Sequence, residues 1–168
     1  RGFALTAASD TEVMALMLAA ASGRTWEERL ERTMPSWKGA YSLVLLGVDC
    51  FIAARDPWGF RPLSIGRTPE GGWAAASETC ALNTLGCTEI TEVENGEIVV
   101  VRGKNTTRHR TTTAANGPAR CAFEFVYFSR PDSEWDGRSV HEVRQKLGEQ
   151  LAIEWPVDAD VVVPVPDS

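Results

Sequence analysis

Three segments of the chain combine apolar residues at helical spacing with the same start signal. In each, a Ser or Thr is followed three residues later by Glu, the capping box in which the hydroxyl accepts a backbone N–H and the glutamate reaches back. The three boxes are Ser9 with Glu12, Thr25 with Glu28, and Ser139 with Glu142. The pattern predicts helices over residues 10–22, 26–34 and 140–154.

Between the second and third helices, short apolar runs alternate with turn residues, which is typical of antiparallel strands. The expected strand pairs are 40–46 with 50–55, 62–67 with 72–76, and 97–102 with 107–113. A short helix is expected over 78–85. Antiparallel strands flanked by helices indicate a layered α+β domain.

The composition changes after this region. Residues 111–118 have no apolar periodicity and are expected to form a linker. An aromatic run over 122–128, the third helix and a β-branched run over 159–163 then predict a strand–helix–strand unit, the opening of a parallel α/β sheet. These features predict one domain over 1–115 and a second over 116–168. Because a sheet that stops there is unfinished, we expect the sequence to be truncated.

Charge and composition exclude some classes of function. The 168 residues contain 17 Lys and Arg against 23 Asp and Glu, a net charge of −6, which argues against a general nucleic-acid binder. No apolar run approaches the roughly 18–20 residues needed to span a bilayer. The four cysteines form no C-x-x-C pair, so we expect buried, reduced thiols in a cytoplasmic protein.

Two motifs carry the chemistry. Residues 121–133 read CAFEFVYFSRPDS and are followed by DGRSVHEVRQKLG over 136–148. Upstream, residues 55–63 read RDPWGFRPL, with ASETCAL over 76–82 and EVENGEI over 92–98. Together these pieces resemble the amidophosphoribosyltransferase family. The RDPWGFRPL hairpin alone is shared more widely among class II glutamine amidotransferases, including asparagine synthetases.

The resemblance implies a two-site enzyme. An N-terminal-nucleophile glutaminase domain releases ammonia from glutamine, and a phosphoribosyltransferase domain uses it to displace pyrophosphate from phosphoribosyl pyrophosphate. The product, 5-phosphoribosylamine, is the first committed intermediate of purine biosynthesis. The chain would hold the later part of the layered glutaminase sandwich (a type 2 glutamine amidotransferase domain) and the first βαβ unit of the phosphoribosyltransferase. Purine nucleotides as feedback ligands and a homo-oligomer are also implied.

Asp10 is the main candidate site residue. It fits the family's S-D-S/T-E element, whose aspartate binds the α-ammonium group of glutamine, a task suited to a charge-assisted hydrogen bond. The alternative is an acidic residue that only favours the first turn of a helix, and the two roles are compatible.

Cys121 is the candidate metal ligand. Some family members hold a 4Fe-4S cluster with a cysteine at this position, and others keep the cysteine without a cluster. A cluster needs about four thiolates, so further ligands would have to come from outside these residues. A plain buried thiol is the alternative. The resemblance also implies Mg²⁺, at a site outside the chain.

The other polar residues of the two motifs favour structural roles. Arg55, Asp56 and Arg61 are expected to brace the hairpin rather than clamp a substrate. The remaining candidates are expected to form an ion-pair and turn network at the domain junction: Glu124, Arg130 and Asp132. His109 and His141 are expected to be solvated. Asp167 and Ser168 follow an expected strand end, where ligand loops belong, but this is a weak signal.

Several family elements are absent from the printed sequence. The family's nucleophile is an N-terminal cysteine activated by its own α-amino group, whereas residue 1 is Arg. The oxyanion-hole pair and the phosphoribosyl pyrophosphate loop are not found either. The resemblance therefore implies an internal fragment that is inactive alone. A non-catalytic binding or regulatory remnant of the same fold, and another class II amidotransferase, stay open as alternatives.

Overall fold

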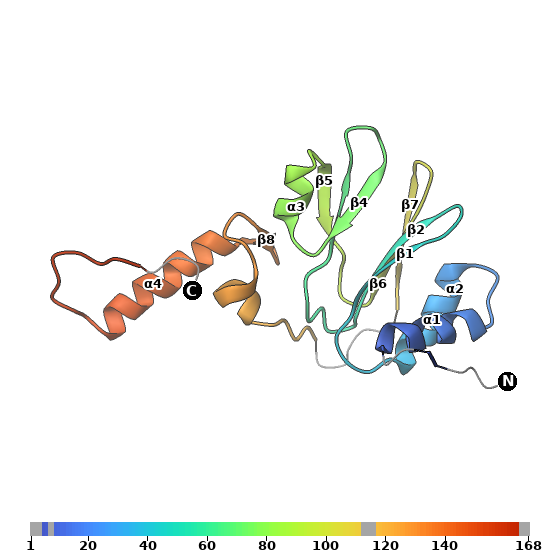
Figure 1. Ribbon diagram of the computed structural model, residues 1–168, viewed down its shortest axis with the longest axis horizontal. Coiled ribbons are helices and arrows are strands. Elements are labelled where there is room, and N and C mark those ends of the chain that lie inside the picture. The colour runs from blue at the N-terminus through green and yellow to red at the C-terminus, as the bar shows by residue number, and fades with distance from the viewer. Residues whose placement is uncertain (1–4, 7–8, 112–116, 165–168) are drawn as a thin grey trace.

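The computed structural model describes residues 5–6, 9–111 and 117–164, and Figure 1 shows how their elements are arranged. The helices are α1 (Asp10–Ala20), α2 (Trp26–Thr33), α3 (Thr79–Thr84) and α4 (Val140–Glu154), with short helical turns η1 (Met34–Ser36) and η2 (Glu124–Phe128). The strands are β1 (Ser42–Leu46), β2 (Phe51–Arg55), β3 (Ser64–Arg67), β4 (Trp73–Ala76), β5 (Thr88–Glu92), β6 (Glu97–Arg102), β7 (Asn105–Arg110), β8 (Glu134–Trp135) and β9 (Arg138–Ser139). None of these helices is long and apolar enough to cross a membrane.

The strands of the described residues form two antiparallel sheets and one small hairpin. The first sheet has the order β1-β2-β6-β7 and the second the order β4-β3-β5, while β8 and β9 pair with each other. All three strand pairs expected from the sequence are therefore present. Strand β5, whose side chains alternate between exposed and half-buried positions, was not expected.

Along the central strands, successive buried side chains face opposite sides of the first sheet, and this alternation produces the layers of the fold. In β2, Ile52 and Ala54 face a cluster that includes Leu18 of α1 and Leu30 of α2, whereas Ala53 faces the second sheet. Since successive side chains of a strand point to opposite faces, the central strands β2 and β6 of the first sheet are buried on both sides. Figure 1 shows α1 and α2 beside one face of this sheet, with the second sheet on the other side. The expected α+β layering is confirmed at this level.

Two of the three predicted helix caps are confirmed. Thr25 Oγ1 accepts from Glu28 N at 3.3 Å, and Ser139 Oγ accepts from Glu142 N at 3.4 Å. The cap predicted at Ser9 is wrong, because its side chain makes no capping hydrogen bond. Helix α1 also ends at Ala20, two residues before the expected end, whereas α4 has the expected bounds.

The predicted strand–helix–strand unit is wrong for the described residues. Residues 122–128 do not form a strand. They form a π-type helical turn that opens at the buried Glu124, with backbone hydrogen bonds between residues 121 and 129. Residues 159–163 lie in no helix or sheet, and Val161–Val163 are more than 70% exposed. A strand needs a hydrogen-bonded neighbour, and no described residue supplies one here.

The expected linker is only partly described. Thr111 N and Oγ1 both donate to Gly96 O, at 2.9 and 2.8 Å, so this end is fixed to the first sheet. Residues 112–116 lie outside the described residues, as do Arg1, Asp167 and Ser168. After the gap, Ala119 N donates to Trp58 O and Cys121 N to Phe60 O. The boundary between 115 and 116 stays a prediction.

Candidate functional site

Asp10 is the first residue of α1 and its carboxylate is exposed to solvent. Its Oδ1 accepts from Thr11 N at 2.9 Å, and Oδ2 has no hydrogen-bond partner among the described residues. The unpaired N–H groups at the start of a helix stabilise a carboxylate in this position. The Asp10 side chain is therefore open to a cationic group from solvent, which is what the predicted role requires.

An apolar groove of about 260 Å³ begins beside Asp10. It runs between α1 and the edge strand β1 and is lined by Thr11, Met14, Ala15, Leu18, Trp26, Leu43, Val44 and Leu45. Thr11, the neighbour of Asp10, lies at one side of it. The lining offers contact surface for a methylene chain but no charge, and the acidic residues next to Thr11 along α1 are Asp10 and Glu12.

The turn after β2 is built around a buried arginine. Arg55 is fully buried, and its guanidinium donates to the carbonyl oxygens of Arg61, Gly59 and Val93 at 2.8, 3.0 and 2.7 Å. It also forms an ion pair with Glu92 at 2.6 Å. All of these partners of Arg55 are groups of the protein itself, as expected of a residue that braces the turn. The prediction that Arg55 braces the hairpin is confirmed.

Asp56 completes the same turn from the other side. This buried carboxylate accepts from the backbone N–H groups of Trp58 at 2.9 Å, Phe60 at 3.3 Å and Tyr41 at 3.3 Å. Burial, with a smaller contribution from the nearby Asp56 charge, raises the pKa of the Tyr41 hydroxyl, which stays neutral. Asp56 is thus a structural residue, as expected.

The RDPWGFRPL turn is joined to the second motif through Arg61. Its Nη1 lies 3.0 Å from Glu124 Oε1, and Ser129 Oγ donates to Glu124 Oε2 at 2.7 Å. From α4, Arg144 donates to the carbonyl oxygens of Phe125 and Ser129, both at 2.6 Å. These bonds connect the hairpin, η2 and α4 in one polar network.

Arg130 and Asp132 form a second, exposed ion pair in this network. The guanidinium of Arg130 donates to both oxygens of Asp132, at 2.9 and 3.0 Å. This contact lowers the pKa of Asp132 and raises that of Arg130. The predicted ion-pair and turn network is confirmed. Of the two histidines, His109 is partly exposed and lies 3.3 Å from Glu31, and His141 is exposed on α4.

Cys121 does not lie in a cluster of metal ligands. It is half-buried, and its nearest polar contact is Arg61 Nη1, 3.9 Å from Sγ. Within the part of the chain that the structure describes, no group of three or more His, Cys, Asp or Glu side chains could hold a metal ion. A cluster needs about four thiolates, so Cys121 as one of its ligands stays a prediction. The prediction of buried, reduced thiols is confirmed for Cys50, Cys80 and Cys87.

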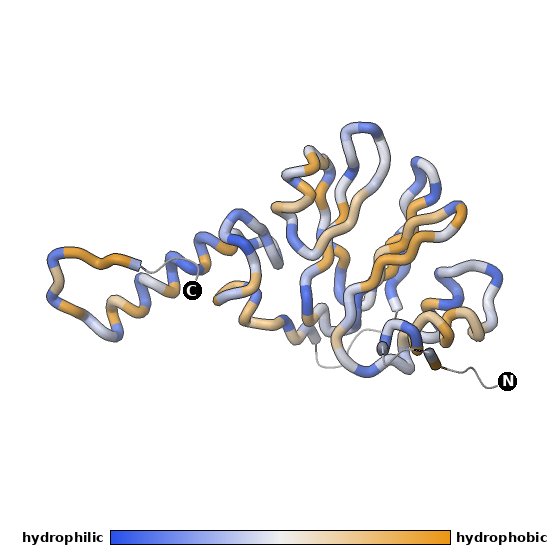
Figure 2. Tube along the Cα trace, in the orientation of Figure 1, coloured by the Kyte–Doolittle hydropathy of each residue, from blue (hydrophilic) through white to orange (hydrophobic). Residues whose placement is uncertain are grey.

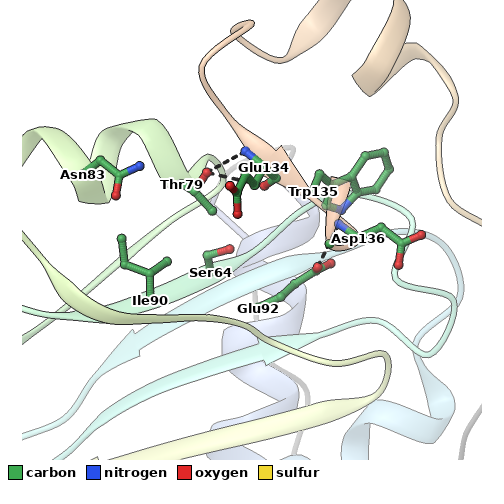
Figure 3. Close-up of a pocket in the computed structure, with 9 residues that line it drawn as sticks. Ser64, Thr79, Asn83, Ile90, Glu92, Glu134, Trp135 and Asp136 are labelled. Atoms are coloured by element: carbon green, nitrogen blue, oxygen red, sulfur yellow. Dashed lines mark hydrogen bonds between the residues drawn. The ribbon is translucent and has the colours of Figure 1, made fainter. Parts of the chain in front are cut away.

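A second pocket, which the sequence did not indicate, lies where the β8–β9 hairpin meets α3 and β5 (Figure 3). Thr79 Oγ1 accepts from Glu134 N at 2.8 Å, and Asp136 N donates to Glu92 Oε2 at 3.1 Å. Two of its carboxylates are already paired, Glu92 with Arg55 and Asp136 with Arg120 at 2.8 Å. The pocket therefore belongs to the junction between the two motifs.

Comparison with known proteins identifies the family. A family model described as a glutamine amidotransferase domain matches residues 1–84, half of the chain. The chain belongs to the glutamine amidotransferase family. Its α+β layers are consistent with the N-terminal-nucleophile form of that domain.

Individual relatives show which glutamine amidotransferases this chain is similar to. The amidophosphoribosyltransferase of Methanocaldococcus jannaschii is 41% identical over 184 residues, covering 100% of this chain and 39% of that protein. The structure of glutamine phosphoribosylpyrophosphate amidotransferase from B. subtilis, complexed with ADP and GMP, aligns with a TM-score of 0.92 at 39% identity, over 99% of this chain and 36% of that one.

A solved structure of the allosteric regulatory enzyme of purine biosynthesis aligns equally well, with a TM-score of 0.91 at 40% identity and the same coverage. The resemblance drawn from residues 121–133 is thus confirmed. The chain spans between 36% and 39% of the length of these three relatives.

Proposed function

We propose that the protein carrying this sequence is an amidophosphoribosyltransferase. It would hydrolyse the side-chain amide of glutamine to glutamate and ammonia. The ammonia nitrogen then bonds to C1 of phosphoribosyl pyrophosphate as the bond to pyrophosphate breaks, which gives 5-phosphoribosylamine for purine biosynthesis. The observation that carries this proposal is the similarity to amidophosphoribosyltransferases over 99% or more of the chain.

In this proposal Asp10 binds the α-ammonium group of glutamine. Its exposed carboxylate at the start of α1 has one oxygen without a partner among the described residues, and the groove beside Thr11 offers apolar contact. A carboxylate and an ammonium group form a strong, charge-assisted hydrogen bond. In this proposal, residues of this chain therefore bind and orient glutamine.

The proposal also covers the ligands, the oligomeric state and the cellular location of the protein. The B. subtilis relative was solved with ADP and GMP, which supports purine nucleotides as feedback ligands here as well. Phosphoribosyl pyrophosphate as second substrate, a homo-oligomeric assembly, a cytoplasmic location and a Mg²⁺ requirement are proposed with it. The layered sandwich of a complete glutaminase domain, followed by a phosphoribosyltransferase domain, is the proposed architecture.

Replacing Asp10 tests the glutamine site in the complete protein that carries this sequence. Asp10→Asn keeps the shape of the side chain but removes its charge, so the KM for glutamine should rise roughly 10- to 100-fold, the worth of one or two charge-assisted contacts. Synthesis driven by added ammonium salt bypasses glutamine and should keep its rate. An unchanged KM for glutamine would show that Asp10 does not bind it.

A further inference from the structure

The side chain of Glu12 fastens the segment that precedes Asp10. Thr6 N lies 3.0 and 3.2 Å from the two carboxylate oxygens of Glu12, and Thr6 Oγ1 donates to Oε1 at 2.7 Å. Thr6 precedes Asp10 by four residues and Glu12 follows it by two. These contacts therefore join two residues that lie on either side of Asp10 in the sequence.

This arrangement differs from an ordinary capping box. In a capping box, the glutamate side chain accepts from the backbone N–H of the N-cap residue, and the N-cap side chain accepts from a backbone N–H of the helix. The N-cap residue of α1 is Ser9, and its side chain makes no capping hydrogen bond. At α2, by contrast, Thr25 caps the helix while Glu28 Oε2 accepts from the adjacent Arg24 N at 2.8 Å. At α1, the carboxylate of Glu12 accepts from Thr6, which lies three residues before the N-cap, and so holds Thr6 beside the first turn of the helix.

The orientation of Asp10 depends on that segment. Among the described residues, its carboxylate has a single hydrogen bond, from the backbone N–H of the next residue, Thr11. No other side chain of the described residues bonds to it. The direction of the free Oδ2 therefore follows the backbone at the helix start, which the half-buried Glu12 holds in place. Displacement of a binding group by about 1 Å can lower catalytic efficiency roughly 100-fold.

We propose that Glu12 is a positioning residue for glutamine, which acts by clamping Thr6 and so orienting the carboxylate of Asp10. This inference rests on the proposed function of Asp10. Glu12 does not touch the substrate in this account. Its negative charge, two residues from Asp10 and in the same helical turn, also adds to the local field that attracts an ammonium group.

The test compares four variants of the complete protein: Glu12→Gln, Asp10→Asn, Thr6→Val and, as a matched helical control, Glu149→Gln. Glu149 lies on the exposed side of α4. For each variant, the KM for glutamine, the kcat and the rate with added ammonium salt are measured. Hydrogen exchange of the Thr6 amide is followed in parallel, because a clamped amide exchanges slowly.

Glu12→Gln should raise the KM for glutamine roughly tenfold, because a displaced Asp10 loses about the worth of its own charge-assisted hydrogen bond to the α-ammonium group. The ammonia-dependent rate should change little. Thr6→Val, which keeps the N–H but loses the hydroxyl, should have a smaller effect in the same direction. Exchange of the Thr6 amide should accelerate in Glu12→Gln, and Glu149→Gln should match the parent protein.

The outcomes separate the two proposals. If Asp10→Asn raises the KM and Glu12→Gln does not, the positioning role is refuted and the glutamine site stands. If Asp10→Asn has no effect, the site assignment fails, and the inference about Glu12 fails with it. Equal losses of the glutamine- and ammonia-dependent rates in Glu12→Gln would show a general structural role and overturn the inference.

Discussion

Replacing Arg55 by Met should destabilise the protein strongly. Methionine has nearly the same length but no donors, so the substitution removes the ion pair with Glu92 and the hydrogen bonds to three backbone carbonyl oxygens. Breaking a buried ion pair costs about 3–5 kcal/mol. Because the Glu92 side chain is 23% exposed, water compensates part of its lost contact, and we expect about 3 kcal/mol.

Urea unfolding followed by tryptophan fluorescence measures this loss. The midpoint should fall at an unchanged m-value, and the thermal midpoint should drop by about 6–12 °C for a protein of this size. Arg138→Met, at an exposed position in β9, is the matched control and should leave the midpoint in place. A loss below about 1 kcal/mol for Arg55→Met would refute the bracing role, since exposed ion pairs already contribute that much.

Two further predictions concern stability. Gly59 has φ +61° and its Cβ would collide with the buried side chain of Asn95, so Gly59→Ala should cost about 2 kcal/mol or more in urea unfolding; Gly71→Ala (φ +83°, open space) should cost only about 1 kcal/mol. The hydrogen bond from Arg102 lowers the pKa of Glu27, so its stabilisation is present above the unfolded-state pKa and is lost as pH falls through the folded-state pKa. Glu27→Gln should therefore flatten the decline of stability below about pH 5, and an unchanged acid limb would contradict the pairing.

The elements that the sequence predicted well are those decided by local interactions. The start of α4 follows from the Ser139 cap, and the β1–β2 hairpin from two apolar runs around a short turn. The structural role of Arg55 was also predictable, because Asp-Pro and Gly in the motif point to a turn. The cap and the hairpin join residues that are close along the chain, whereas Arg55 also bonds to Glu92 and Val93, 37 and 38 residues away.

The errors arise where distant residues decide the structure. The aromatic run over 122–128 has strand propensity, but Glu124 is bound by Arg61, 63 residues earlier, and by Ser129, which favours a compact turn. The pocket at the β8–β9 hairpin depends on Thr79 and Glu134, which are 55 residues apart. At Ser9 the motif is present, but the side chain makes no capping hydrogen bond, and the carboxylate of Glu12 accepts from Thr6.

Transfer of isotope tests the proposed activity most directly. The complete protein that carries this sequence is incubated with phosphoribosyl pyrophosphate and glutamine labelled with ¹⁵N in the side-chain amide, and the products are analysed by mass spectrometry. The account predicts ¹⁵N in 5-phosphoribosylamine, with one glutamate and one pyrophosphate formed for each product. Glutamate formation without label in the ribosylamine, or no reaction of either substrate, would contradict it.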